Sequence, residues 1–336
     1  MRVERIYPAD DERQLRLCYD LVLSGQPEDD PAAPASYRLF RSWWTRGFSG
    51  EPRQVWLASS ESGTPLGCYL IDFPSRENRQ TCFVSPHVAL TARRRGVGAA
   101  LVAHAAGQAA AEGRSLLMSG SRVDSPGEAF AAAIGARPGL VEARRVLAAG
   151  EALRARLPAL RAAALQYSVG YELIRWAGAT PDDLVAGVCA VNNAMEDAPH
   201  DASYEPLRWD ADRVRTIDEV AAWRGTREYS VAARHTASGQ MAALTQVSLD
   251  PDLADWAFQG LTAVTRPHRG HRLGLLVKVA MLEWLAEREP QVRQIMTFNA
   301  AQNEHMISVN AQLGHRVTAT FRAFELETAA AAKPDR

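Results

Sequence analysis

The stretch that decides the fold is HVALTARRRGVGAALV, residues 87–102, in which a strand-like run passes through an arginine loop into a helix. A strand that ends at Leu90 and a helix that begins near Val97 leave backbone N–H groups without partners at one point. The helix dipole adds partial positive charge there. Such a junction favours an anion, and a diphosphate is its natural occupant. Gly96 and Gly98 allow a close approach because they carry no Cβ.

Three consecutive arginines occupy this loop and offer charge-assisted hydrogen bonds to phosphate. The simpler interpretation of such a run is a solvated face. The spacing lacks the GxxxxGK[ST] pattern of a P-loop. It also comes late in a series of strands, which argues against a dinucleotide-binding unit, where the glycine loop follows the first strand.

A second copy of the pattern follows in RPHRGHRLGLLVKVA, residues 266–280. Placing Arg269 opposite Arg93 brings Gly274 opposite Gly98, and a later glycine follows each loop at a nearly equal distance. Self-similarity at this scale predicts two α+β halves of like order. The length of 336 residues agrees, because single hydrophobic cores usually stop growing before that size.

The rest of the chain fits the same order of elements twice. In the first half we expect strands at 3–7, 55–60, 65–73, 81–90 and 115–120 and helices at 10–23, around 40–44, at 97–112 and at 127–135. In the second half we expect strands at 170–176, 229–235, 241–249, 255–265 and 294–298 and helices at 181–195, 275–287 and 302–314. Residues 143–165 carry leucines at helical spacing among arginines, which predicts an exposed amphipathic connector. The expected division is a first domain over 1–150, a helical connector over 151–167, a second domain over 168–328 and a disordered tail over 329–336.

Composition excludes several classes of function. The net charge of −1 provides no field that would hold a nucleic acid, so an anion site has to be local. The cysteines are far apart and the histidines form no ligand-like motif, so we expect reduced thiols and no metal site. The four cysteines are Cys18, Cys68, Cys82 and Cys189. The N-terminus has no signal-like apolar run and no segment suits a bilayer, which favours a cytoplasmic protein without membrane partners.

The loop RRRGVG, residues 93–98, matches the Q/R-x-x-G-x-G/A signature of the GNAT acetyltransferase superfamily. The second half, with RPHRGHRLGLLVKVAMLEWL and TFNAAQNEHMISVNAQLGHRV, resembles tandem actinobacterial GNAT proteins, a group that includes mycothiol synthase. The resemblance implies an α+β fold of two tandem GNAT-like domains, each a mixed, mainly antiparallel sheet flanked by helices. It further implies a V-shaped splay between the fourth and fifth strands of each sheet.

In that family the loop holds the diphosphate of acetyl-CoA, and the strand before it contacts the pantetheine arm. Carried over by position, this implicates Val88, Leu90, Arg93, Arg94, Arg95, Gly96, Val97, Gly98 and Ala99 in the first half and Val264, Arg266, Arg269, Gly270, His271, Arg272, Leu273, Gly274 and Leu275 in the second. The second loop departs from the signature, because Arg272 stands where the first glycine is expected. A positive φ there would strain a residue with a side chain, unless Gly270 supplies the flexibility. We hypothesise that Arg272 binds a phosphate itself.

Three asparagines of the second half form another group of candidates. The resemblance gives Asn299 and Asn303, at the end of the fifth strand and the start of the next helix, a role in binding the pantetheine. Asn303 equally suits a helix N-cap. Asn310 occupies the position at which the family usually has a tyrosine that protonates the leaving thiolate, and Ala131 occupies it in the first half. Neither residue is an acid, so a water molecule is the alternative proton donor.

The reaction needs a neutral amine. In the first half the strands offer only His87 and Asp72 for its deprotonation, and His87 also suits a packing role. The other candidates lie in the second half. The fourth strand offers Gln259 but no carboxylate. The loop AMEDAPHDASYEP offers Glu196 and Asp197, together with His200 and Asp201. The resemblance implies that such a loop overhangs the acceptor channel, where its acids also suit a cationic amine. The alternative is a solvated acidic loop.

The sequence therefore predicts an N-acetyltransferase that transfers an acyl group, with acetyl-CoA as donor, to a primary amine of a small molecule by direct transfer in a ternary complex. We expect the second half to be catalytic, the first to bind coenzyme A structurally, and the protein to be a monomer or homodimer. The competing function is a non-catalytic acyl-CoA-binding protein, which the missing tyrosine favours.

Overall fold

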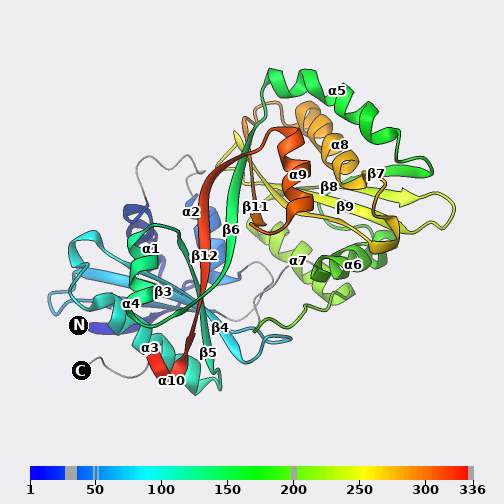
Figure 1. Cartoon of the computed structure of the whole chain (residues 1–336). Coiled ribbons are helices and arrows are strands. Elements are labelled where there is room, and N and C mark those ends of the chain that lie inside the picture. Colours follow the sequence, from blue (N-terminus) through cyan, green and yellow to red (C-terminus); the bar gives the residue numbers. More distant parts are fainter. Residues whose placement is uncertain (27–35, 48–49, 51–52, 198–202, 332–336) are drawn as a thin grey trace.

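A computed structural model describes residues 1–26, 36–47, 50, 53–197 and 203–331 of the chain (Figure 1). The elements of its first half are β1 (Arg2–Ile6), α1 (Glu12–Ser24), α2 (Tyr37–Thr45), β2 (Arg53–Ser59), β3 (Pro65–Asp72), β4 (Thr81–Val88), the 3-10 turn η1 (Leu90–Ala92), α3 (Val97–Ala111), β5 (Leu116–Arg122), α4 (Pro126–Ala133) and β6 (Arg137–Ala148).

The second half repeats this order of strands and helices. Its elements are α5 (Glu151–Leu165), β7 (Tyr171–Ala177), η2 (Asp182–Leu184), α6 (Val185–Asn193), η3 (Ala194–Asp197), α7 (Ala211–Arg224), β8 (Arg227–His235), β9 (Met241–Leu249), β10 (Trp256–Val264), η4 (Arg266–His268), α8 (Leu273–Arg288), β11 (Gln294–Ala300), α9 (Glu304–Leu313), β12 (Arg316–Glu327) and α10 (Thr328–Ala331). The sequence of elements from β1 to β6 therefore corresponds to that from β7 to β12.

All twelve strands form one sheet in the order β1-β2-β3-β4-β5-β12-β6-β11-β10-β9-β8-β7. The last strand of each half pairs with the other half, since β12 joins β5 and β6 joins β11, both antiparallel. The two exchanged strands also pair with each other, and Figure 1 shows them side by side through the middle of the molecule. Neither half completes its own sheet.

Three elements differ from the expectation. Residues 137–148, whose second part was expected to belong to an exposed helix, form β6, and there Arg144 and Arg145 are buried. The prediction was based on leucine spacing. This spacing does not indicate a strand whose pairing partners lie in the other half of the chain. Helix α5 is amphipathic as expected: most of its residues are exposed, while Leu153 and Leu157 pack into a core with α8. The strand β12 and the helix α7 were not anticipated.

Helices cover both faces of the sheet, so each half has two hydrophobic cores. In β8, Val231 belongs to the cluster that includes Leu276 of α8, whereas the next residue, Ala232, packs with Val188 of α6. This alternation follows from the period of two in a strand. Figure 1 shows α8 and α9 on one side of the second half and α6 and α7 on the other.

The expected splay is present in both halves. The parallel pairing of β4 with β5 extends only from Thr81 to Phe83, although β4 continues to Val88. Likewise β10 pairs with β11 only from Trp256 to Phe258. Beyond these points the two strands of each pair separate and create an opening at their carboxyl ends. Both arginine loops begin at this edge of the sheet.

The end of the chain is partly ordered. A disordered tail was expected from residue 329, but α10 continues to Ala331 and packs on α3. Residues 332–336 of the expected tail lie outside the described residues. Among the described parts of the chain, no helix has the length and hydropathy needed to cross a membrane.

The strand exchange predicts that the halves fold only together. If the chain is cut at Gly150 and the fragments are produced separately, β5 and β11 each lose a strand partner and expose an edge that favours aggregation. We expect both fragments to be insoluble alone and to co-purify as a stoichiometric complex when co-expressed. A monomeric fragment 1–150 with a cooperative thermal transition would contradict this interpretation.

Candidate functional site

The two arginine loops have the same backbone shape. Each loop has two positions with positive φ, at Arg94 (60°) and Gly96 (79°) in the first half and at Gly270 (86°) and Arg272 (52°) in the second. The helices that follow, α3 and α8, both begin without a side-chain cap. Their first N–H groups are thus available at the open edge of the sheet, as the sequence pattern predicts.

Arg272 has the positive φ that was expected to strain it. The glycine and the arginine are interchanged between the loops, because the second loop has its glycine at the position equivalent to Arg94. Both positions need positive φ, so Gly270 does not replace Gly96 but serves its own place in the turn. The guanidinium of Arg272 lies 4.3 Å from the centre of the Tyr167 ring, where a cation–π contact holds it beside the loop.

A Cβ added at the second residue of α8 would meet a more distant neighbour than one added at the second residue of α3. A Cβ placed on Gly98 would meet the Phe130 ring of α4 at 3.2 Å, whereas the nearest atom to one on Gly274 is a methyl of Val264 at 3.8 Å. An aromatic ring therefore closes against the first loop, and the second has no equivalent contact at this position.

A buried chain of hydrogen bonds links α8, α9 and β11. Lys278 Nζ donates to Asn310 Oδ1 at 2.6 Å, and Asn310 Nδ2 donates to Asn299 Oδ1 at 2.6 Å. Asn310 is fully buried and Lys278 is 2% exposed. Burial lowers the pKa of Lys278 to about 7. Because Lys278 donates to Asn310, the atom of the Asn310 amide that faces the lysine must be the oxygen. Nδ2 of Asn310 therefore points to Asn299, and the atom of Asn299 that accepts from it must be Oδ1.

Asn303 caps a helix. Its Oδ1 accepts a hydrogen bond from Met306 N at 3.1 Å at the start of α9. This is the alternative that its position between a strand and a helix left open. A role of Asn303 in cofactor binding stays a prediction.

Strand β10 carries a bulge at the point where it leaves β11. Gln259 pairs with Val247 and Thr262 with Thr245, so Gly260 and Leu261 together oppose Gln246. Bulges of this kind bend a strand and often occur next to active sites. The amide of Gln259 donates to Thr245 Oγ1 at 2.8 Å and is buried. The first half has no such irregularity in the described pairing of β3 with β4.

A cavity of about 370 Å³ lies between the bulge and the helices α6 and α7. Its lining includes the backbone of the bulge, aromatic and apolar groups, and several charged side chains. Among the lining residues are Glu196, Leu207, Trp209, Asp218, Arg224, Glu228, Phe258, Gly260 and Leu261. A volume of this size suits a small molecule.

The charged lining of the cavity is mainly acidic, with three carboxylates and one guanidinium. Burial raises the pKa of Glu228, which accepts a hydrogen bond from Thr226 Oγ1 at 2.7 Å. Asp218 accepts a hydrogen bond from Thr180 N at 2.9 Å. Glu196 accepts one from Leu207 N and one from the Tyr204 hydroxyl, both at 3.0 Å. Asp218 also forms an ion pair with Arg215, whose Nη1 lies 3.5 Å from its Oδ2, so Glu196 and Glu228 carry the excess of acidic groups that favours a cation in the cavity.

In the first half, aromatic side chains fill the space under α1 and α2. Phe40 stacks on Trp44 with ring centres 4.5 Å apart, and Trp44 lies 6.2 Å from His87 of β4. Burial lowers the pKa of His87 to about 4, so it is a neutral packing residue. The aromatic cluster of α2 is core, with Trp43 exposed at its edge.

Only some of the catalytic residues expected from sequence lie at the cavity. Glu196 lines the cavity, while Gln259 and Asn310 are occupied by neighbouring side chains. The side chain of Asp197, and His200 and Asp201, lie outside the described residues. Sequence reasoning missed Asp218, Glu228 and Lys278. A carboxylate at the start of a strand and a lysine on the apolar face of a helix were the signals available.

No family model and no curated protein matches the chain. Among solved structures, it is similar to a tandem GNAT protein from the clavulanic acid biosynthesis pathway, with 28% identity and a TM-score of 0.80 over 100% of this chain and 99% of that one. The predicted fold of two tandem GNAT-like halves is thereby confirmed.

Two more distant structures agree in fold alone. A GCN5-related N-acetyltransferase from Sphaerobacter thermophilus has 16% identity and a TM-score of 0.64, covering 97% of this chain and 95% of that one. A GCN5-related glucosamine N-acetyltransferase region of a fungal multi-domain GH3 β-N-acetylglucosaminidase has 13% identity and the same TM-score, covering 97% of this chain and 38% of that one.

The buried lysine predicts a specific pH dependence of stability. Its pKa is about 7 in the folded chain and about 10.4 when unfolded, so between these values the unfolded chain binds one more proton. The free energy of unfolding contributed by Lys278 therefore rises from about pH 7 to about pH 10 and is lowest below pH 7. Urea unfolding of Lys278→Met should lack this rise. Parallel pH profiles of the two proteins would contradict the assignment.

Proposed function

We propose that this chain, which has the tandem GNAT fold, is an acyl-CoA-dependent N-acyltransferase whose reaction takes place in its second half. One observation carries the proposal. The acidic cavity ends at the bulge of β10, the point where β10 and β11 separate. An amine in the cavity and a thioester in the splay would meet there, as direct transfer in a ternary complex requires.

The residues around the second loop fit acetyl-CoA. The uncapped start of α8 and the turn from Arg269 to Leu275 would hold the diphosphate through backbone N–H groups. Asn299, oriented through Asn310 and Lys278, faces the region between α8 and α9 and would bind the pantetheine arm. When bound, acetyl-CoA supplies the activated acyl group. The chain's own task is to position that group and to exclude water.

For the acceptor we propose a small molecule with a primary amine and a positive charge. Glu228 and Asp218 provide negative charge on the cavity wall. Glu228 pairs with Ser248, and Ser248 pairs with Phe258, so Glu228 stands two strands from β10, roughly 10 Å away. That separation is too long for direct proton transfer to an amine at the bulge. It suits recognition of a second cationic group on the acceptor.

Proton transfer in this site does not depend on a tyrosine. Asn310 stands in its place and is fully buried, with its oxygen held by Lys278. A thiol has an ordinary pKa of about 8.5, so a thiolate leaves without a strong acid and water can protonate it. The same feature favours a second candidate function, a protein that binds acyl-CoA without turnover.

The first half is proposed as a structural partner with a loop that retains the coenzyme A pattern. Its arginine loop has the same positive φ positions, but Phe130 closes against α3 and aromatic rings fill the acceptor side. We therefore assign the transfer reaction to the second half.

Arg272 gives the first test. Arg272→Gly removes the side chain and suits a φ of 52°, whereas Arg272→Ala removes the same side chain and keeps the strain. If Arg272 binds a phosphate, both variants should lose about tenfold in affinity for coenzyme A, the value of one charge-assisted hydrogen bond. Calorimetric titration measures it. Unchanged affinity in both variants would remove this role.

Separate obstruction of the two loops tests which half is active. Gly274→Trp should abolish release of free thiol from acetyl-CoA in the presence of polyamines, aminoglycosides or amino-acid amides, because an indole would fill the start of α8. Gly98→Trp is the matched variant of the first half and should retain most turnover. Equal loss in both would defeat the assignment. Binding of acetyl-CoA without thiol release by any amine would favour the non-catalytic alternative.

A further inference from the structure

The segment that covers the acceptor cavity has no regular structure of its own. Residues 203–210, here called the cover segment, precede α7 and contain no helix or strand. Leu207 and Trp209 of this segment line the cavity. Backbone groups outside helices and sheets need other partners, and these decide where such a segment lies.

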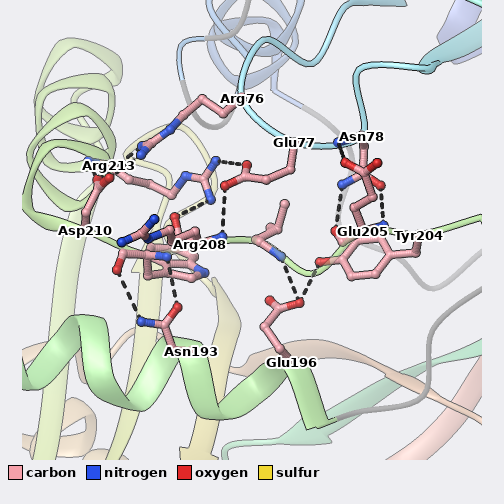
Figure 2. A network of polar contacts seen from close by, with 12 residues as sticks. Arg76, Glu77, Asn78, Asn193, Glu196, Tyr204, Glu205, Arg208, Asp210 and Arg213 are labelled. Atoms are coloured by element: carbon pink, nitrogen blue, oxygen red, sulfur yellow. Dashed lines mark hydrogen bonds and ion pairs between the residues drawn. The ribbon is translucent and has the colours of Figure 1, made fainter.

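The turn between β3 and β4 of the first half supplies partners at one end of the cover segment. Asn78 has a φ of 54° and is 8% exposed. Its Oδ1 accepts from Glu205 N at 2.7 Å, and its Nδ2 donates to Glu205 O at 2.9 Å. Asn78 N also donates to a carboxylate oxygen of Glu205 at 2.9 Å. Figure 2 shows this reciprocal arrangement.

Glu77, next to it, reaches the other end of the cover segment. It accepts from Arg208 N at 2.9 Å and from Arg213 Nη2 at 2.6 Å (Figure 2). Both side chains of the ion pair are largely buried. Burial alone would raise the pKa of Glu77, but the hydrogen bonds from Arg213 and Arg208 outweigh it and lower the pKa. The carboxylate therefore remains charged at neutral pH.

Two further residues of the same turn extend the contact. Arg76 forms an ion pair with Asp210, the N-cap of α7, with Nη1 and Oδ1 3.1 Å apart. This pairing is the main cause that lowers the pKa of Asp210 to about 2. Gln80 Nε2 donates to Ser203 O at 3.0 Å. The turn thus touches the cover segment from its first residue to its last.

On its inner side the cover segment is held by α6 and η3. Asn193 bonds both backbone groups of Trp209, accepting from its N at 2.9 Å and donating to its O at 3.2 Å. Glu196 accepts from Leu207 N. The backbone N–H groups of residues 205 and 208 therefore face the first half, and those of 207 and 209 face the cavity side.

The first half also reaches the cavity wall at a second place. Arg224 of α7 lines the cavity, and its Nε donates to Ser42 Oγ of α2 at 2.9 Å. Its Nη2 donates to Gly47 O at 3.3 Å. The first half thus holds the guanidinium of Arg224, which lies among the carboxylates of the cavity lining.

We propose that Glu77 and Asn78 are positioning residues for the acceptor cavity of the other half: they hold the cover segment in place and so set acceptor affinity without touching the acceptor. The proposal rests on the proposed function for the identity of the cavity. It gives the first half a role in the reaction that requires no active site of its own.

Hydrogen exchange of the protein without ligand tests the positioning directly. Asn78→Gly removes both side-chain hydrogen bonds to Glu205 while suiting the positive φ. We expect amide exchange in residues 203–210 to become about tenfold faster, with no change in α8. Ser62→Ala, whose hydrogen bonds stay within the turn between β2 and β3, is the matched control. Unchanged exchange in the cover segment would overturn the proposal, whether or not any amine is acetylated.

Kinetics with spermidine as the acceptor probe give a second readout. Glu77→Gln and Asn78→Gly should each raise the KM for spermidine about tenfold and leave the KM for acetyl-CoA within about twofold. A rise of both KM values together with a lower Tm would indicate general loss of structure and overturn a specific role. Loss of exchange protection without any change in the spermidine KM would overturn it as well.

Discussion

The whole arrangement depends on the antiparallel ladder between β6 and β12. Each strand is the last of its half, yet each occupies a place in the sheet of the other half, between the partner's fifth and last strands. Twelve strands thereby share one hydrogen-bonded sheet. The sheet of each half is completed by a strand of the other half, so each half stabilises the other. Folding of the halves is coupled, because an unpaired central strand would leave a full row of backbone groups unsatisfied.

This coupling allows the two halves to differ. With the sheet shared, the first half keeps the arginine loop and the fold, while aromatic rings of α2 pack against β4 and Phe130 closes against α3. The second half keeps a cavity and a bulge in β10. The same shared sheet brings the turn after β3 against residues 203–210, so the first half contacts the segment that lines the cavity of the second.

The sequence predicted what local pattern determines. The glycine and arginine loops and the helices that follow them are determined by a few adjacent residues. A positive φ at Arg272 was one of two possibilities at the sequence level, and the structure has it together with a positive φ at Gly270. The strands β6 and β12 were missed because their pairing is non-local. In β6 the buried Arg144 and Arg145 also made the sequence resemble the polar face of an amphipathic helix. Lys278 was missed for a related reason, since only the fold brings it to Asn310. The acids of the cavity come from three separate elements, which no spacing reveals.

The most direct test is a crystal structure with acetyl-CoA bound. The account predicts electron density for the diphosphate at the first turn of α8, and for the thioester where β10 leaves β11, with the acetyl group directed toward the acidic cavity. Density in the cleft of the first half alone, or in neither cleft at millimolar ligand, would contradict the claim that the second half is the catalytic one.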